Sequence, residues 1–256
     1  MKTLPVPPAP ADEFSHAIPH ANVVDRTVAL ERLAAGKRVL HVGFVDEGRM
    51  TDRMQREEWL HSRLAAVSGE LVGLDRDPGG VSAARNLGFE AYAADCQDQA
   101  ALSALGIDPA ELIIAGELIE HLDQPGLFLE AVKGLLRPDG ALVITTPNAT
   151  RVLNILGSVL NREFVNDDHV CWFSWHTLSA LLTRHGWQLD DLAYYVAPRR
   201  SSSRQWPARV RAQIHAANLA RQGIALLARA RPAVADGLVV TASLRARHPG
   251  EHRRAG

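Results

Sequence analysis

The sequence has few cysteines, no long apolar run and almost no excess charge. Its two cysteines, Cys96 and Cys171, are too few for a disulfide framework and lack the spacing of metal ligands, which fits a reducing compartment. Prolines interrupt the first eight residues, where a signal peptide needs a continuous apolar stretch, and no later run is long enough to cross a bilayer. The net charge of −1 supplies no field for binding nucleic acid. We therefore expect a cytoplasmic protein without a nucleic-acid partner, while a peripheral membrane contact stays open.

What the chain does have is enough apolar material for one large domain, since 46% of its 256 residues are hydrophobic. Residues 1–20 are rich in proline and are expected to form a flexible arm. An α/β domain is expected over 21–198, an arginine-rich helical insertion or lid over 199–236, the final strand of the domain over 237–246 and a disordered tail over 247–256. These features leave the oligomeric state undetermined.

Apolar runs alternate with helical patterns along most of the chain. The expected strands cover residues 38–42, 71–74, 89–93, 111–115, 141–145, 187–196 and 237–244. The expected helices cover residues 26–34, 51–67, 78–87, 125–136 and 175–185, with one or two more within 199–231 and a turn at Pro138–Gly140. Strand-then-helix alternation of this kind predicts an α/β fold, with a doubly wound parallel sheet covered on both faces.

The stretch from Lys37 to Asp75 has the form of the first strand, loop, helix and second strand of a nucleotide-binding sheet. A dinucleotide fingerprint needs three spaced glycines, whereas here Gly43 and Gly48 are present and Val45 occupies the place of another. This argues against a pyrophosphate cofactor. A ligand without phosphates, whose charged end is an amino acid, needs less of this glycine cradle.

Two aspartates follow the second and third strands. Asp75 can accept hydrogen bonds from a ribose diol, although it can also cap the next helix, a role that Asp77 could fill instead. Asp95 can accept from an adenine amino group, with the backbone amide of Cys96 beside it, or it can be an ordinary turn aspartate. Both positions are therefore candidate nucleoside contacts.

Three segments carry a family resemblance. Gly73–Pro78 (GLDRDP), Gly116–Leu122 (GELIEHL) and Leu135–Asn148 (LLRPDGALVITTPN) resemble class I S-adenosylmethionine-dependent methyltransferases. The resemblance extends from about Val39 to Val196. It implies a Rossmann-like sheet of seven strands whose last strand is antiparallel, a methyltransferase activity, and S-adenosyl-L-methionine as the cofactor.

The resemblance also implies the cofactor contacts. Gly43, Phe44 and Gly48 would hold the methionine end, Asp75 and Arg76 the ribose, Asp95 and Cys96 the adenine, and Glu117, Leu118 and His121 the floor beneath the cofactor. His41 is counted among these contacts because it stands where the family usually has an acid before the first glycine. The connection to the second strand is longer than is usual in the family.

The acceptor is suggested by two further segments. Leu60–Leu64 and Asn166–Ser174 are similar to methyltransferases associated with saccharide and cell-surface glycan pathways. This similarity implies O-methylation of a sugar, a saccharide or a related small molecule, so a glycan precursor is the expected acceptor. Two alternatives stay open: methylation of nitrogen or carbon on another metabolite, and a non-catalytic protein that binds S-adenosylmethionine.

Methyl transfer to a hydroxyl requires alignment of the nucleophile and removal of its proton. A histidine near the site is the economical base. We expect this base to be His169, with Asp168 as its orienting carboxylate and His121 as the second candidate. Each histidine also has a plainer interpretation, since His169 can be a structural loop residue and His121 can shape the cofactor pocket or cap a helix.

Two charged groups have more than one interpretation. Asp167, Asp168 and His169 could hold a hard cation such as Mg²⁺, which would acidify a sugar hydroxyl, although such a cluster is more often a solvated polar turn. The segment 199–231 carries eight arginines and no acidic residue. It is interpreted as a solvated helix face, a lid over an anionic substrate or a membrane-surface contact.

Overall fold

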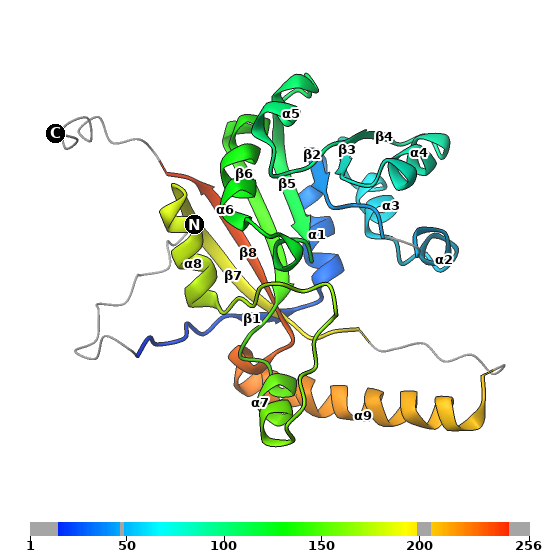
Figure 1. The fold of residues 1–256 in the computed structure, drawn as a ribbon. Helices are drawn as coiled ribbons and strands as arrows, with labels where there is room; N and C mark the ends of the chain where they lie inside the picture. Colours follow the sequence, from blue (N-terminus) through cyan, green and yellow to red (C-terminus); the bar gives the residue numbers. More distant parts are fainter. Residues whose placement is uncertain (1–14, 47–48, 199–205, 246–256) are drawn as a thin grey trace.

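One mixed β-sheet of eight strands organises residues 15–46, 49–198 and 206–245, the parts of the chain that the computed structural model describes (Figure 1). The strands are β1 (Asn22–Val24), β2 (Arg38–Val42), β3 (Glu70–Asp75), β4 (Glu90–Ala93), β5 (Ala110–Gly116), β6 (Leu136–Pro147), β7 (Trp187–Tyr195) and β8 (Gly237–Leu244). Their order across the sheet is β1-β7-β8-β6-β5-β2-β3-β4. β8 is antiparallel to β6 and β7, and the other neighbours are parallel. The predicted Rossmann-like α/β fold with an antiparallel last strand is confirmed.

Helices cover both faces of this sheet. They are α1 (Arg26–Ala34), α2 (Met50–Gln55), α3 (Leu60–Ala65), α4 (Pro78–Asn86), α5 (Gln99–Ala104), α6 (Pro125–Ala131), α7 (Val152–Val159), α8 (Trp175–Arg184) and α9 (Ala208–Ala230), with 3-10 turns η1 (Ile119–His121), η2 (Val132–Leu135) and η3 (Pro232–Val234). Successive residues of β5 point to opposite faces. Ile113 therefore packs with α6 and α8, while Leu112 packs with α1 and α3.

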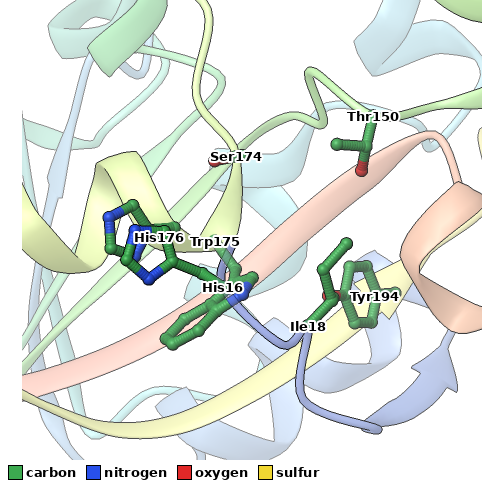
Figure 2. Close-up of a pocket in the computed structure, with 7 residues that line it drawn as sticks. All are labelled: His16, Ile18, Thr150, Ser174, Trp175, His176 and Tyr194. Carbon is green, nitrogen blue, oxygen red and sulfur yellow. The ribbon is translucent and has the colours of Figure 1, made fainter. Parts of the chain in front are cut away.

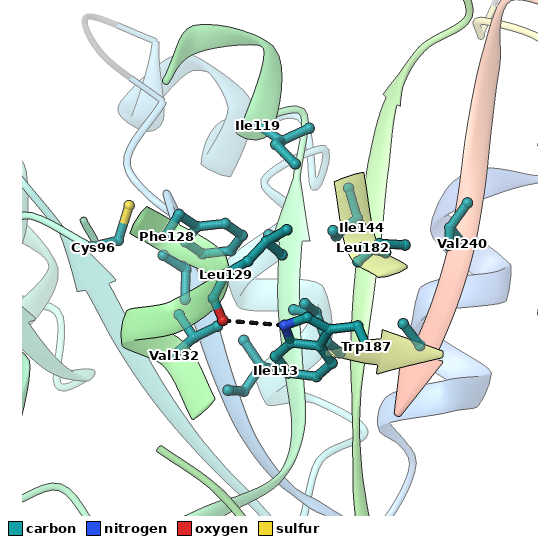
Figure 3. Close-up of a cluster of buried hydrophobic side chains, with 14 of the residues drawn as sticks. Cys96, Ile113, Ile119, Phe128, Leu129, Val132, Ile144, Leu182, Trp187 and Val240 are labelled. Carbon is teal, nitrogen blue, oxygen red and sulfur yellow. Dashed lines mark hydrogen bonds between the residues drawn. The ribbon is translucent and has the colours of Figure 1, made fainter. Parts of the chain in front are cut away.

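Part of the largest of the three apolar clusters among the described residues is drawn in Figure 3. Phe128 and Leu129 of α6 and Leu182 of α8 are fully buried there against the sheet. Trp187, at the start of β7, is also buried, and its indole N–H donates to the carbonyl oxygen of Leu129 over 3.1 Å. This bond satisfies the one polar atom of a large apolar side chain, so α6 is fixed to the sheet by both packing and a hydrogen bond.

Side-chain caps fix where the helices near the sheet edge begin. Asp77 accepts from the amides of Gly79 and Gly80 at the start of α4. Ser174 and Thr177 form a reciprocal capping box at the start of α8. Such caps satisfy amide groups that have no partner within the first helical turn. The connections from strand to helix are thereby held in single conformations.

The sheet contains one strand more than predicted. Among the described residues β1 is an eighth strand, which pairs in parallel with β7 from Asn22↔Ala193 to Val24↔Tyr195. A strand of three residues gives no periodic signal in the sequence. It forms because the outer edge of β7 would otherwise present unpaired backbone groups, which the chain just before α1 covers.

Two predicted elements are divided differently in the structure. The helix expected over 51–67 is two helices, α2 and α3, because the chain breaks at Glu57, whose φ is +58°. The turn expected at Pro138–Gly140 lies inside β6, where the pairing with β5 shifts register between Ala110 and Leu112. The extra residues are absorbed as an irregularity in the strand rather than as a separate turn.

Two helices lie at the edge of the sheet where β6 and β7 end. α7 follows β6, and α9 connects β7 to the start of antiparallel β8 (Figure 1). Ile214, Ile224 and Ala228 of α9 are buried, whereas Leu219 and Leu226 are exposed. Over the described ranges, no helix combines the length and apolar character needed to cross a membrane.

Candidate active site

The carboxyl ends of the parallel strands bring the predicted site residues to one edge of the sheet. Gly43 follows β2, Asp75 ends β3, Glu117 follows β5, and Thr145 and Thr146 lie near the end of β6. Ligands of open α/β sheets bind at this edge. Gly48 lies outside the described residues.

Gly43 makes the turn that leaves β2. Its φ is +70°, and a Cβ atom there would lie 2.8 Å from Cδ1 of Leu118. Both the backbone conformation and the close approach of Leu118 therefore require glycine. Its amide donates to the carbonyl of Leu74 over 2.8 Å, which ties the loop to β3. The two predicted contacts Gly43 and Leu118 are in this way brought together.

Val45 occupies the position where the family pattern has a glycine, and the structure accommodates its side chain against α4. A Cβ atom on Gly80 would lie 2.2 Å from Cγ1 of Val45, so the valine fits because residue 80 has no side chain. The amide of Val45 donates to Oδ2 of Asp75 over 2.9 Å. The side chain at position 45 is thus accommodated by a glycine at position 80, on the facing helix α4.

The carboxylate of Asp75 is oriented by two backbone amides. Val45 donates to Oδ2 and Asp77 donates to Oδ1 over 3.0 Å. Burial raises the pKa of Asp75, and these two hydrogen bonds act in the opposite direction. Each carboxylate oxygen keeps capacity for a further bond. Because Asp77 caps α4, Asp75 has no capping role.

The adenine side of the predicted site is partly exposed. Asp95 is exposed and accepts from the amide of Gln97 over 2.9 Å, as in an aspartate turn. Cys96 beside it is 8% exposed, and burial raises the pKa of its thiol to about 12. The thiol is therefore protonated, and its backbone amide is the group that remains for a ligand. Arg76 is exposed.

His41 and Phe44 face the protein interior. The ring of His41 is 2% exposed, and its Nδ1 lies 3.1 Å from Nδ1 of His61 on α3. Burial, followed by the neighbouring His61, holds the pKa of His41 well below its usual range. Phe44 packs on Gly73 and on the ring of Trp59. The backbone at these positions borders the edge, whereas the side chains belong to the core.

Glu117 lies at the centre of a hydrogen-bond network. Its φ is +55°, which is uncommon for a residue with a side chain. Its Oε1 accepts from the hydroxyl of Tyr195 over 2.8 Å and from that of Thr145 over 3.0 Å. Arg26 donates to Thr145 Oγ1 over 2.9 Å and lies 3.8 Å from Glu117 Oε1. The sequence pattern did not indicate Arg26 or Tyr195, since each is remote in the chain and belongs to an ordinary helix or strand.

Glu120 is a buried acid with one unsatisfied oxygen. Its side chain is 1% exposed; Oε2 accepts from Thr146 over 2.9 Å, and Oε1 has no hydrogen-bond partner among the described residues. Burial, followed by the negative charge of Glu117, raises the pKa of Glu120 to about 8. The carbonyl of Glu120 accepts from the amides of Val170 and Cys171, so the loop that carries His169 is tied to η1.

His121 and His169 lie beside this acid. Their ring centroids are 4.5 Å apart in an edge-to-face arrangement, and Nδ1 of His121 is 3.1 Å from the carbonyl oxygen of Asp168. Nδ1 of His169 is buried and has no hydrogen-bond partner in the part of the chain that the structure describes. Burial, followed by His121, lowers the pKa of His169. The two histidines predicted from the sequence therefore meet in space, across 48 positions of chain.

Glu120, His121 and His169 form a compact set of donor groups. One ligand atom from each lies within 4.8 Å of the others, and this is the one group of three or more such residues within the described ranges. We refer to it as the Glu120–His121–His169 cluster. It shares His169 with the predicted set of Asp167, Asp168 and His169, but Asp168 contacts His121 through its backbone and both aspartates are exposed.

A family model described as a methyltransferase domain matches residues 15–192. The chain belongs to this family. The recognition of a class I S-adenosylmethionine-dependent methyltransferase from the sequence is thereby confirmed, and so is the enzyme class. The saccharide part of that recognition is not specified by the match.

Relatives of this methyltransferase include the ubiquinone biosynthesis O-methyltransferase of Azorhizobium caulinodans, which is 28% identical over 109 residues, covering 41% of this chain and 42% of that protein. The mitochondrial ubiquinone biosynthesis O-methyltransferase of Rattus norvegicus is 32% identical over 53 residues, covering 21% of this chain and 15% of that protein. The matched segments thus span less than half the length of these relatives.

Solved structures agree with the fold. A methyltransferase from Archaeoglobus fulgidus, described as dependent on S-adenosylmethionine, superposes with a TM-score of 0.50 at 16% identity, over 84% of this chain and 91% of that one. At this identity the likeness shows the fold alone.

A separate cavity of about 240 Å³ lies beside α8 (Figure 2). Its lining residues come from the segment before β1, the loop after β6, the start of α8 and β7; they are His16, Ile18, Thr150, Ser174, Trp175, His176 and Tyr194. The rings of His16 and His176 stack with centroids 3.7 Å apart. Among the described residues, none of Glu120, His121 and His169 lines this cavity, so it is distinct from the Glu120–His121–His169 cluster.

Proposed function

We propose that this protein transfers a methyl group from S-adenosylmethionine to a hydroxyl oxygen of a small molecule. The choice of an oxygen acceptor rests on His169, which lies beside the loop that follows β5. This histidine has a lowered pKa, and its Nδ1 has no hydrogen-bond partner among the described residues. Such a group can take the proton of a hydroxyl. The names of the relatives, which are O-methyltransferases, point in the same direction.

The residues at the sheet edge fit the donor. The turn at Gly43, whose φ is +70°, presents backbone without a side chain at the sheet edge, which suits the methionine end, and the oriented carboxylate of Asp75 suits the two ribose hydroxyls. Asp95 and the amide of Cys96 are proposed for the adenine, and Glu117, Leu118 and His121 for the floor. When bound, S-adenosylmethionine supplies an electrophilic methyl group on a sulfonium.

The proposed transfer is an in-line displacement. The S–CH₃ bond breaks with its electron pair left on sulfur, the O–CH₃ bond forms, and the hydroxyl proton passes to the imidazole of His169. The lowered pKa of His169 keeps the ring neutral, and therefore able to accept a proton, at neutral pH. His121 packs against this ring and is fixed in turn by the backbone of Asp168. Asp168 thus acts through its carbonyl rather than as the orienting carboxylate that was predicted.

Two classes of hydroxyl acceptor are proposed: a saccharide or glycan precursor, and a compound of the kind methylated in ubiquinone biosynthesis. The similarity of Leu60–Leu64 and Asn166–Ser174 to glycan-pathway enzymes favours a saccharide or glycan precursor. The relatives are named for ubiquinone biosynthesis instead. A nitrogen or carbon acceptor is the weaker alternative, since it would leave the base at His169 without a role.

The first experiment separates donor binding from transfer. Calorimetry with S-adenosylmethionine and S-adenosylhomocysteine should show binding, and methyl transfer from labelled donor is then measured on a panel of simple saccharides, catechol and an amine. His169→Ala should lower transfer by about a hundredfold while donor affinity is kept. His185→Ala is the matched control. Nδ1 of His185 lies 2.8 Å from Oε1 of Glu130, and neither residue belongs to the cluster.

Failure of both donor compounds to bind would overturn the proposal. Full transfer by His169→Ala would show that the base is wrongly assigned and would favour a nitrogen or carbon acceptor. Transfer to catechol without transfer to sugars would decide the acceptor class against the saccharide.

A further inference from the structure

We propose that the Glu120–His121–His169 cluster binds one divalent transition-metal ion, of the Mn²⁺ or Zn²⁺ class. The three residues come from η1 and from the loop before α8, and one donor atom of each lies within 4.8 Å of the others. A metal ion bound at about 2.0–2.2 Å from each donor would bring pairs of donors to roughly 3–4 Å from one another. The donor atoms would therefore draw closer together when an ion binds.

The buried oxygen of Glu120 needs a partner. Its Oε1 has none within the described residues, although the side chain is 1% exposed. Leaving a buried carboxylate oxygen unsatisfied costs free energy, because the group has lost its water without a replacement. A cation restores that interaction. The other oxygen is held by Thr146, which fixes the carboxylate in one orientation.

His121 is prepared to act as a ligand. The carbonyl oxygen of Asp168 can only accept a hydrogen bond, so Nδ1 of His121 must be the protonated nitrogen. In the neutral ring Nε2 then carries a lone pair. Histidines that bind metal ions commonly donate their other N–H to a backbone carbonyl in this way.

His169 supplies the second imidazole. Its Nδ1 is buried and has no hydrogen-bond partner within the described ranges, and its ring lies edge to face with that of His121. The amides of Val170 and Cys171, next in the chain, bond to the carbonyl of Glu120. The backbone therefore holds the loop histidine close to the acid, independently of any bound ion.

The donor set decides the kind of ion. Two imidazole nitrogens and one carboxylate oxygen suit Mn²⁺, Fe²⁺, Co²⁺ or Zn²⁺, whereas Mg²⁺ prefers oxygen ligands. The proposed site therefore differs from the expected Mg²⁺ site in both the ion and two of the three ligands. When bound, the ion would supply Lewis acidity beside the acceptor. His169 would then be occupied as a ligand, so the base role proposed above belongs to the protein without the ion.

That catalytic consequence rests on the proposed function, but ion binding does not. Metal-free protein, prepared with a chelator, is titrated calorimetrically with MnCl₂, ZnCl₂ and MgCl₂ in the absence of donor and acceptor. One Mn²⁺ or Zn²⁺ per chain is expected, with Mg²⁺ at least about tenfold weaker. Electron paramagnetic resonance of the Mn²⁺ protein should show hyperfine coupling to imidazole nitrogen.

Variants identify the ligands. Glu120→Gln and His169→Ala should each weaken Mn²⁺ and Zn²⁺ binding by roughly tenfold or more. His185→Ala removes the histidine of the His185–Glu130 pair and should leave binding unchanged, which controls for surface histidines among the eleven in the chain. Circular dichroism checks that each variant is folded, and the nitrogen coupling of the unaltered protein provides a readout that needs no variant.

Absence of stoichiometric Mn²⁺ and Zn²⁺ binding would overturn the inference. Binding that survives both Glu120→Gln and His169→Ala, or that lacks nitrogen coupling, would overturn it as well, because the ion would then lie elsewhere. Methyl transfer by protein that binds no ion would leave the proposed function standing without the metal site. Ion binding by protein that binds no S-adenosylmethionine would leave the metal site standing without the proposed function.

Discussion

The Nδ1 atoms of His41 and His61 lie 3.1 Å apart in the interior of the protein. One ring must donate and the other accept, so the accepting ring is neutral and carries its proton on Nε2. Burial lowers the pKa of both histidines, which favours the neutral form of the donating ring as well. Their side chains are 2% and 0% exposed, and burial lowers the pKa of His61 to about 3. His41, at the position where the family usually has an acid, is thus a neutral residue paired with His61.

This pair should make stability depend on pH. The pKa of each ring is lower in the folded than in the unfolded protein, where it is about 6.5. Above that value neither state binds the proton. Below it the unfolded chain is protonated first, so stability should fall by about 1.4 kcal/mol per pH unit for each histidine, until pH approaches the folded values.

Urea unfolding at pH 8, 7, 6 and 5 measures the stability of the unaltered protein and of His61→Phe. Below pH 6.5 the variant should lose stability less steeply. Glu120, with a raised pKa of about 8, acts in the opposite sense between about pH 4.5 and 8, but it does so equally in both proteins. Parallel curves for the two proteins would contradict the assignment.

Gly80→Ala should destabilise the protein by about 1–3 kcal/mol, because the new methyl group would overlap the side chain of Val45. Adding Val45→Ala should recover much of this loss, as expected for two residues in direct contact. Gly223→Ala, in open space on α9, is the matched control and should stabilise by roughly 0.4–1 kcal/mol. Thermal or urea unfolding measures all three, and additive effects at positions 45 and 80 would contradict the contact.

Asp75→Asn should weaken S-adenosylmethionine by roughly tenfold or more, since a charged acceptor for two hydroxyls is lost. Asp77→Asn is the control next in the chain. An asparagine can still cap α4, so its donor affinity should match that of the unaltered protein. Calorimetry gives both affinities. Equal losses at the two positions would indicate a disturbed loop rather than a ribose contact.

Tyr195→Phe should destabilise the fold by about 2 kcal/mol, because it removes a buried hydrogen bond to the carboxylate of Glu117. Tyr194→Phe tests the neighbouring position, where burial alone raises the pKa of the hydroxyl to about 12. Its effect should be within about 0.5 kcal/mol. Equal unfolding midpoints for the two variants would show that the hydrogen bond from Tyr195 to Glu117 makes no net contribution to stability.

Much of the fold followed from local pattern. The helix Arg26–Ala34 and the strands Arg38–Val42 and Gly237–Leu244 have the predicted bounds, because apolar periodicity and capping residues coincide there. β1 was missed because three residues carry no period. Residues 51–67 were joined into one helix because the apolar spacing continues across the break at Glu57.

The sequence by itself determined the family, the fold class and the strand ends at which chemistry is expected, since glycines, aspartates and the segment Gly116–Leu122 recur at family positions. It also indicated His121 and His169 separately. Tertiary structure alone decided that these two meet at the buried acid Glu120, that Val45 is accommodated by Gly80, and that His41 pairs with His61. The reason is physical: each of these contacts joins residues from different elements, and only the packing of those elements sets the distances.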